Sequence, residues 1–218
     1  MALVGVIPAA GYGTRLQPIA GSKEVLPVRG RQVIDYLVER MRAAGVDELR
    51  VVTRPEKADV ARRARQLGAD VIRGRPANVS ESILLGGEGL ASGDRVLVGF
   101  PDTLWEPVDG FVRLLGALSG DVEIVLGLFR TPQLGRSDVV TVEGVRVTGV
   151  YPKPAEPQSE LVWGCLAARA GALAGLREYG EPGDYLGLLA RTGVVHAVDF
   201  GTRFVDIGTP ASYAEAAG

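Results

Sequence analysis

The segment ALVGVIPAAGYGTRLQPIAGSKEVLPV, residues Ala2–Val28, places a glycine-rich, cationic loop directly after a short apolar run. The run ALVGVI is typical of a buried β-strand. In the loop that follows, Gly11 and Gly13 permit positive φ and let backbone N–H groups come close to a ligand. Backbone donors that curl after a strand form a concavity for phosphate oxygens. Arg15 adds a bidentate fork and Lys23 a mobile point charge, so the loop is a candidate polyphosphate site.

The loop differs from the two familiar phosphate-binding loops. The pattern GxxxxGK[ST] is absent, and Leu16 stands where a dinucleotide-binding GxGxxG loop needs its third glycine. The glycines alone therefore leave open a plain glycine-rich surface loop.

Composition indicates an ordinary globular chain. Its 218 residues are 46% hydrophobic and 23% charged, with a net charge of -2, which suits one large domain with a substantial core. The slight negative charge argues against a general nucleic-acid binder, which normally carries a basic surface. No apolar run approaches the roughly 18 residues that span a bilayer, and the N-terminus lacks signal-peptide features. We expect a soluble, cytoplasmic protein with neither nucleic-acid nor membrane partners.

The single cysteine and the single histidine both fall in strand-like runs. Cys165 lies in LVWGCLAAR and His196 in GVVHAVDF, so a buried thiol and a strand histidine are expected. One cysteine excludes an internal disulfide framework, and one histidine excludes a histidine-based metal cluster. The candidate chemistry therefore lies in the loops between elements.

Apolar strands and amphipathic helices alternate over the first 130 residues or so. We expect strands at 2–7, 48–53, 69–73, 95–100 and 122–129, and helices at 32–45, 55–68, 80–92 and 107–119. This alternation predicts an α/β fold with a mostly parallel sheet and helices on both faces.

Beyond this region the pattern changes to an α+β extension. We expect two strands within 137–153 around a turn at 143–144, strands at 161–170 and 193–201, and helices at 170–178 and 181–192. No linker composition separates the two parts, which indicates a single domain over residues 1–218.

Ligands of open α/β sheets bind beyond the carboxyl ends of the strands. Besides the opening loop, PDT and VDIGTP follow strand-like runs, and they contain Asp102 and Asp206. Lysine is scarce: the chain has only Lys23, Lys57 and Lys153 and otherwise uses arginine. Lys57, at a predicted helix start, is interpreted as solvated charge. Taken singly, the two aspartates also fit turn caps, and Lys153 fits surface charge.

The opening string as a whole resembles the signature GxGTRLxPxTxxxPKxLLPV of the sugar nucleotidyltransferases, also called nucleoside-diphosphate-sugar pyrophosphorylases. Its matching positions are Gly11, Gly13, Thr14, Arg15, Leu16, Pro18, Lys23, Leu26, Pro27 and Val28. Ser22 replaces the usual proline and Ala20 the usual threonine.

Three later segments extend the resemblance in the same order along the chain. LVGFPDTLW resembles the strand that ends in a metal-binding aspartate, here Asp102. VTGVYPKPAEPQSELVWGCLAAR resembles EKPxxPxSxxAxxGxYxF, with Lys153 and Gly164 among the matches. RFVDIGTPASYAEA resembles WxDxGTPxxYxxA and supplies the second carboxylate, Asp206.

The resemblance implies a Rossmann-like three-layer sandwich with a mostly parallel mixed sheet, of the nucleotide-diphospho-sugar transferase type. Residues of about 1–130 would bind the nucleotide, and those of about 131–218 the sugar phosphate. The implied reaction joins an NTP, with dTTP or UTP the commonest case, to a sugar 1-phosphate such as glucose 1-phosphate. The products are an NDP-sugar and pyrophosphate, and the cofactor is Mg²⁺. Self-association into a homo-oligomer stays open.

The resemblance also implies a role for each matching residue. Arg15 and Lys23 would be catalytic, with Arg15 on the leaving pyrophosphate and Lys23 at the reacting phosphates. Asp102 and Asp206 would bind Mg²⁺. Lys153 would bind the phosphate of the sugar 1-phosphate. The nucleotide-binding residues would be Ala10, Gly11, Gly13, Thr14 and Arg15, and Gly164 would belong with Lys153.

Two departures from the family pattern leave the substrate undecided. Pro152 stands in place of the glutamate that usually contacts sugar hydroxyls. The base-reading segment is represented only by RPANVSESILLGG, without its glutamine or its Gly-Thr-Ala, and no role is assigned to residues 80–82. Two alternatives therefore remain: a cytidylyl- or guanylyltransferase that uses a non-sugar phosphate acceptor, and a non-catalytic relative that binds nucleotide sugars.

Overall fold

The structure, a computed structural model, describes residues 1–16, 21–132 and 134–217. The motif positions Pro18 and Ala20 lie outside the described residues. Strands of the main sheet are β1 (Leu3–Pro8), β4 (Glu48–Thr53), β5 (Asp70–Arg73), β6 (Arg95–Gly99), β7 (Thr103–Trp105), β8 (Ile124–Arg130), β9 (Val139–Glu143), β10 (Arg146–Tyr151), β11 (Leu161–Arg169) and β12 (Val195–Asp206).

The remaining elements within the described residues are a short hairpin, six α-helices and four 3₁₀ helices. The hairpin pairs β2 (Pro27–Val28) with β3 (Arg31–Gln32). The α-helices are α1 (Val33–Ala43), α2 (Ala58–Gln66), α3 (Val79–Gly86), α4 (Gly110–Ala117), α5 (Pro182–Ala190) and α6 (Pro210–Ala217). The 3₁₀ helices are η1 (Thr14–Leu16), η2 (Lys23–Val25), η3 (Leu134–Arg136) and η4 (Ala170–Glu178).

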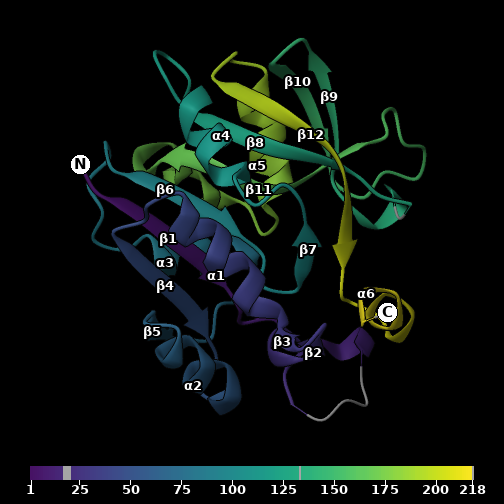
Figure 1. Ribbon diagram of the computed structural model, residues 1–218. Coiled ribbons are helices and arrows are strands. Elements are labelled where there is room, and N and C mark those ends of the chain that lie inside the picture. Colours follow the sequence, from purple (N-terminus) through teal and green to yellow (C-terminus); the bar gives the residue numbers. More distant parts are fainter. Residues whose placement is uncertain (17–20, 133, 218) are drawn as a thin grey trace.

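The main sheet runs in the order β5-β4-β1-β6-β11-β8-β12-β10-β9, and β7 pairs with the end of β12 (Figure 1). Strands β5, β4, β1 and β6 are parallel. β11 is antiparallel to both β6 and β8, and β10 is antiparallel to β12 and β9, whereas β8 and β12 are parallel. The sheet is therefore mixed, and along this order β11 and β10 run against the other strands.

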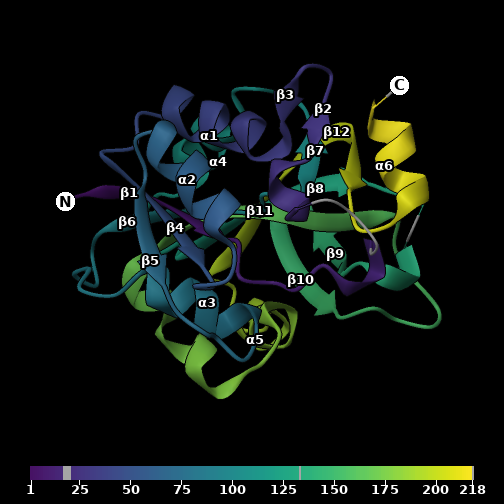
Figure 2. The ribbon, with the colours of Figure 1, turned by 90° about the horizontal axis from the view of Figure 1, so that it is seen from below.

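Helices cover both faces of the sheet. Figure 2 shows α1, α2 and α4 on one side of the strands and α3 and α5 on the other. Ile34, Val60 and Phe111 belong to the apolar cluster under the first group of helices. Ile83 and Leu186 belong to the cluster under the second. This arrangement confirms the expected pattern of helices on both faces.

Three predicted elements differ most from the structure, in extent or in kind. The helix expected at 80–92 ends at Gly86, because a glycine run follows in which Gly89 adopts a φ of 79°. The segment expected as an α-helix at 170–178 is the 3₁₀ helix η4. The strand expected at 193–201 continues to Asp206, because its last residues pair with β7.

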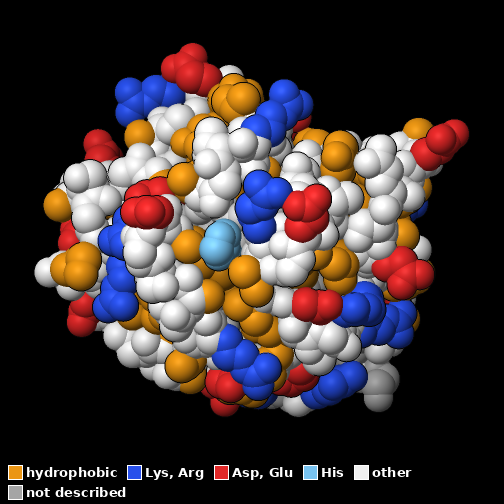
Figure 3. Space-filling model, turned by 90° about the horizontal axis from the view of Figure 1, so that it is seen from above, with side chains coloured by type: hydrophobic (Ala, Val, Ile, Leu, Met, Phe, Trp, Pro, Cys, Tyr) orange, Lys and Arg blue, Asp and Glu red, His pale blue; other side chains and the backbone are white. Residues whose placement is uncertain are grey.

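The single cysteine and the single histidine lie in strands, as expected. Cys165 is buried in β11, and burial raises the pKa of its thiol. His196 is half-buried in β12, and the histidine is visible at the surface in Figure 3. On the face drawn there, basic and acidic side chains are interspersed. No helix in the described ranges is long and apolar enough to cross a membrane.

The C-terminal segment closes over the region of the opening loop. Leu16 and Val28 share a small apolar cluster with Ile207, just beyond β12, and with α6. Tyr213 of α6 donates a hydrogen bond from its hydroxyl to the Pro27 carbonyl at 2.9 Å. The first and last parts of the chain therefore meet at the carboxyl ends of β1 and β12 (Figure 1).

Candidate active site

The opening loop follows β1 with a series of backbone N–H donors. None of the N–H groups of residues 10–15 has an acceptor among the described residues. Gly13 adopts a φ of 65°, and its carbonyl accepts the N–H of Leu16 at 3.1 Å, which starts η1. A row of free N–H groups of this kind favours an anion. Ala10, Gly11, Gly13 and Thr14 all belong to this row.

Lys23 links the far end of the loop to the end of β6. Its ammonium group contacts an Oδ atom of Asp102, and the two side chains are only 16% and 14% exposed. Although burial lowers it, the pKa of Lys23 lies above its ordinary value because the charge and hydrogen bond of Asp102 outweigh burial. Lys23 therefore stays protonated at neutral pH and brings a fixed positive charge to the sheet edge.

Arg15 and Asp206 form the second charged pair of the site. Arg15 Nη2 lies 3.9 Å from Asp206 Oδ2, and the Arg15 side chain is 58% exposed. Burial, followed by the negative charge of Asp102, raises the pKa of Asp206 to about 6. The structure thus brings together Arg15, Lys23, Asp102 and Asp206, which come from distant segments of the chain.

The two aspartates form a donor set that fits Mg²⁺. Both carboxylates line the same cavity, and the negative charge of Asp102 contributes, after burial, to the raised pKa of Asp206. No group of three or more His, Cys, Asp or Glu side chains arranged to hold a metal occurs in the described ranges. Mg²⁺ in phosphoryl-transfer sites commonly takes one or two protein carboxylates and completes its shell with substrate oxygens and water. Because Lys23 contacts Asp102, an ion bound there would share or replace that contact.

A cavity of about 180 Å³ lies beside these residues. Asp102 and Asp206 line it together with Val79, Phe100, Thr103, Arg136, Ser137, Asp138, Trp163, Glu181, Pro182 and Phe204. Its wall combines aromatic rings with charged groups. Two of the rings, those of Trp163 and Phe100, pack edge to face with centroids 5.5 Å apart. Such a wall is typical of a site for a small polar ligand.

Asp138 and Trp163 are cavity residues that the sequence reasoning missed. Trp163 Nε1 donates to Asp138 Oδ2 at 3.2 Å, and burial raises the pKa of the Asp138 carboxyl. Asp138 directly precedes β9, and an aspartate just before a strand is typical of a solvent-exposed strand end. The indole that covers it comes from β11, and no local pattern links the two.

Lys153 and Gly164 lie at the periphery of this cavity. Lys153 Nζ is 3.4 Å from Glu181 Oε1, both side chains are about half exposed, and Lys153 has a φ of 43°. Glu181 in turn lines the cavity, so Lys153 stands at its rim. Gly164 is buried in β11, and a Cβ there would lie 2.4 Å from Phe204 Cε2. Its observed role is thus to let Phe204 pack closely.

The prediction that Lys57 is a solvated charge is wrong. The Lys57 side chain is only 12% exposed, and its ammonium group contacts Glu24, which is 1% exposed. The one hint in the sequence was the scarcity of lysine.

Residues 80–82, to which the sequence assigned no role, lie in α3. Ser80 and Ser82 are buried there, and their hydroxyls have no partner among the described residues.

Comparison with known proteins shows which chains this one resembles. A family model described as MobA-like NTP transferase domain matches residues 5–132. A glucose-1-phosphate thymidylyltransferase from Streptomyces griseus is 27% identical over 165 residues, which cover 72% of this chain and 46% of that protein. UTP–glucose-1-phosphate uridylyltransferase 1 of Staphylococcus saprophyticus is 44% identical over 54 residues, 24% of this chain and 19% of that protein. This chain thus spans less than half the length of these relatives.

The fold is shared with solved nucleotidyltransferases. A UTP-bound UGPase from Acinetobacter baumannii superposes with a TM-score of 0.82 at 21% identity, covering 100% of this chain and 92% of that one. At this identity the likeness establishes the fold alone. The match extends through both the first part of the chain and the α+β extension.

Proposed function

The chain belongs to the family of MobA-like NTP transferase domains, and from this premise we propose that it transfers a nucleotidyl group from an NTP to a sugar 1-phosphate. The proposed substrates are dTTP or UTP and glucose 1-phosphate, in keeping with the names of the relatives. The observation that carries the proposal is the convergence of Arg15, Lys23, Asp102 and Asp206 beside loop N–H groups that have no acceptor within the described ranges. Helices on both sheet faces support the three-layer, Rossmann-like class expected from the sequence.

In the proposed reaction, an oxygen of the sugar 1-phosphate attacks the α-phosphorus of the NTP. A new P–O bond forms, the bond to the oxygen that bridges to the β-phosphate breaks, and pyrophosphate leaves with the electron pair. Positioning and charge neutralisation then supply most of the rate, and no covalent enzyme intermediate is needed. The buried thiol of Cys165 is in keeping with this, because a protonated, inaccessible thiol is no nucleophile.

Each charged residue of the site has a part in this proposal. Arg15, more than half exposed, would hold the pyrophosphate, and the free N–H groups of the loop would bind the β- and γ-phosphates. Lys23 would neutralise charge at the reacting phosphates. Asp102 and Asp206 would hold Mg²⁺, which when bound neutralises phosphate charge and polarises P–O bonds.

The cavity lined by Asp138, Trp163 and Glu181 would take the acceptor. Pro152 stands in place of the glutamate that the family resemblance places on sugar hydroxyls. The carboxylates of Asp138 and Glu181 would instead accept hydrogen bonds from those hydroxyls. Lys153, at the rim, would bind the acceptor phosphate if it gives up Glu181. Gly164 would support this subsite indirectly, by fixing Phe204.

A second candidate is a transferase that uses CTP or GTP and a non-sugar phosphate acceptor. The observation in its favour is the same cavity, because Phe100 and Trp163 beside Asp138 also suit a small amino or alkyl group. A non-catalytic nucleotide-sugar binder would not require the pair Asp102 and Asp206, which the site retains.

The test is a pyrophosphate-release screen of dTTP, UTP, CTP, GTP and ATP against sugar 1-phosphates and small alkyl or amino phosphates, with Mg²⁺. Turnover of a pyrimidine NTP with glucose 1-phosphate is the expected result. Turnover only with a non-sugar acceptor would replace the proposal by the second candidate. Binding of nucleotide sugars without turnover of any pair would favour the non-catalytic relative. Asp102→Asn protein, run in parallel, controls for contaminating activity.

A further inference from the structure

The segment from the end of β4 to the first turn of α2 holds the opening loop through three charged side chains, Arg54, Lys57 and Asp59, which we call the loop clamp. Arg54 Nε donates to the carbonyl of Ala10 at 2.7 Å. Asp59 accepts the N–H of Ser22 at 2.7 Å and its hydroxyl at 2.8 Å. The loop is therefore fixed near both of its ends from the same side.

Lys57 is the centre of the loop clamp. Its Nζ lies 2.8 Å from the carbonyl oxygen of Ala9, 3.0 Å from that of Gly11 and 2.6 Å from Glu24 Oε1. An ammonium group has three N–H donors, and these three partners use all of them. Lys57 thus joins the two backbone segments that enclose the loop, one just after β1 and the other within η2.

This ion pair is buried at a cost to stability. Burial raises the pKa of Glu24 even though Lys57 opposes the shift, and Glu24 Oε2 has no partner among the described residues. Buried ion pairs commonly contribute less to stability than apolar residues of the same size. The pair instead fixes the position of the loop. An ammonium group with three donors fits converging carbonyls better than the planar guanidinium group of an arginine.

The carbonyl contacts decide which groups of the loop are free. The carbonyls of Ala9, Ala10 and Gly11 all accept hydrogen bonds from the loop clamp, whereas the N–H groups of residues 10–15 have no acceptor in the described part of the chain. If these carbonyls turned toward a polyphosphate, they would repel it. The loop clamp holds these carbonyl oxygens, the negative ends of the peptide dipoles, away from the polyphosphate. The N–H donors are then left for the phosphate oxygens.

We propose that Lys57 is the positioning residue that keeps the opening loop in its phosphate-binding conformation, without itself touching the nucleotide. The inference rests on the proposed function, since it assigns the loop to the NTP. It predicts a selective defect: nucleotide and pyrophosphate binding depend on Lys57, whereas acceptor binding in the cavity beside Asp138 does not.

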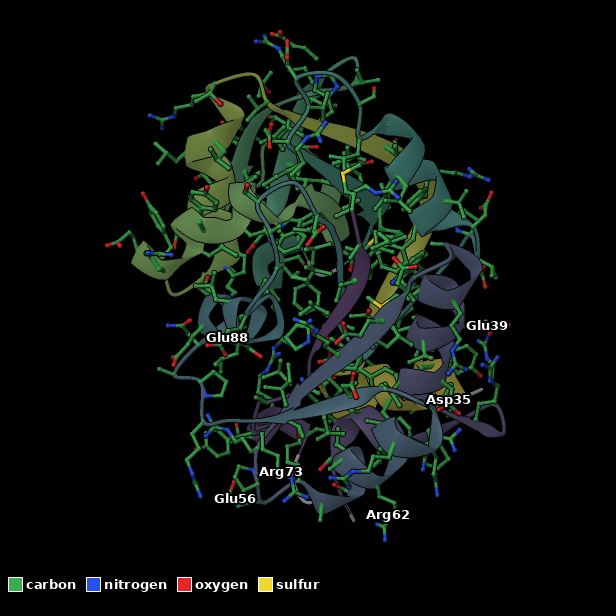
Figure 4. The ribbon with its side chains drawn as sticks, turned by 90° about the vertical axis from the view of Figure 1, so that its left-hand side faces the viewer. Asp35, Glu39, Glu56, Arg62, Arg73 and Glu88 are labelled. Carbon is green, nitrogen blue, oxygen red and sulfur yellow. The ribbon has the colours of Figure 1, made fainter. Side chains whose placement is uncertain are left out.

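The test compares K57M with a matched control, R62M. Arg62 lies on the same helix, α2, and points into solvent (Figure 4), so its loss removes equal charge without touching the loop. For each protein, calorimetry gives the Kd of the NTP with Mg²⁺, and steady-state assays give the KM of each substrate. We expect K57M to weaken NTP binding about tenfold or more, with little change in the KM of the acceptor. K57R, which keeps the charge, is expected to lie between K57M and the wild type.

The outcomes separate this inference from the proposed function. A wild-type protein that neither binds nor turns over any NTP would overturn the proposed function. Wild-type turnover together with unchanged NTP affinity in K57M would overturn the inference and leave the function standing. An equal rise in both KM values would indicate general loosening and would also count against it. If K57M does not fold, E24Q, which removes the charge that holds Lys57, carries the same comparison.

Discussion

The ammonium group of Lys23 contacts a carboxylate oxygen of Asp102, although 79 positions separate the two residues in sequence. The contact joins the opening loop after β1 to the turn after β6, strands that lie side by side and parallel. Because parallel neighbours end at one edge of the sheet, their following loops meet there. The pair is therefore a direct product of the sheet topology, and it places a cation beside the proposed metal-binding carboxylate.

Asp102→Asn is expected to leave the fold intact and to reduce turnover by roughly 100-fold or more, because the proposed transition state loses a fixed negative partner for its cation. Steady-state pyrophosphate release and a thermal melt measure the two effects. Asp109→Asn is the control, since Asp109 is an exposed aspartate paired with Arg113. Near-normal turnover in the Asp102 variant would contradict the metal-binding role.

Arg15→Met is expected to weaken pyrophosphate and NTP binding about 10- to 100-fold, the size of a lost hydrogen bond to a charged group. Its thermal stability should stay near the wild-type value, because the Arg15 side chain is 58% exposed and its contact to Asp206 is long. Inhibition by added pyrophosphate measures the first effect. A variant with unchanged pyrophosphate inhibition would show that Arg15 does not hold the leaving group.

Much of this site could be predicted because it is assembled at strand ends. The opening loop and Asp102 follow apolar runs that are typical of strands, and the parallel pairing of β1 with β6 brings those two strand ends together. Asp206 reaches the same place at the end of β12, where the last residues of that strand pair antiparallel with β7 and Asp206 lies opposite Thr103. The contacts of Lys57 could not be predicted, because its partners, the carbonyl of Gly11 46 positions earlier and the buried carboxylate of Glu24, meet it only in the folded chain.

The cavity proposed to bind the acceptor could not be predicted, for a similar reason. Asp138 becomes a cavity residue only because Trp163, 25 positions later, donates to it from a strand inserted antiparallel in the sheet. Alternating strands and helices predict parallel pairing, and nothing local signals that β11 enters between β6 and β8. In the proposed function, substrate specificity therefore depends on the part of the fold that sequence patterns describe least well.

Gly164→Ala is expected to destabilise the protein by about 1–3 kcal/mol, because the new Cβ would lie 2.4 Å from Phe204 Cε2 and 3.1 Å from Phe129 Cε2. Activity should fall as well, since Phe204 precedes Asp206 on the same strand. Gly116→Ala is the matched control: it lies in α4 with nothing within 4 Å of its Cβ, and it should gain roughly 0.5–1 kcal/mol. Denaturant melts measure both, and a neutral Gly164 variant would contradict the close-packing role.

Asp59 makes the loop clamp sensitive to acid. Although burial opposes the shift, hydrogen bonds from the N–H and hydroxyl of Ser22 hold the pKa of Asp59 below its ordinary value of 3.8. A carboxyl whose folded pKa is depressed contributes stability that is complete above its unfolded pKa and is lost as the pH falls through the folded one. We therefore expect this contribution to disappear progressively below about pH 4.

Asp59→Asn removes that contribution at every pH, so the variant should be less stable than the wild type at neutral pH and should converge on it in acid. Urea melts between pH 7 and pH 3 measure the difference. The contact of Ser22 also predicts weaker NTP binding at neutral pH in the variant, because the end of the loop that leads into Lys23 is released. A stability difference that stays constant down to pH 3 would show that Asp59 acts by packing and not through its charge.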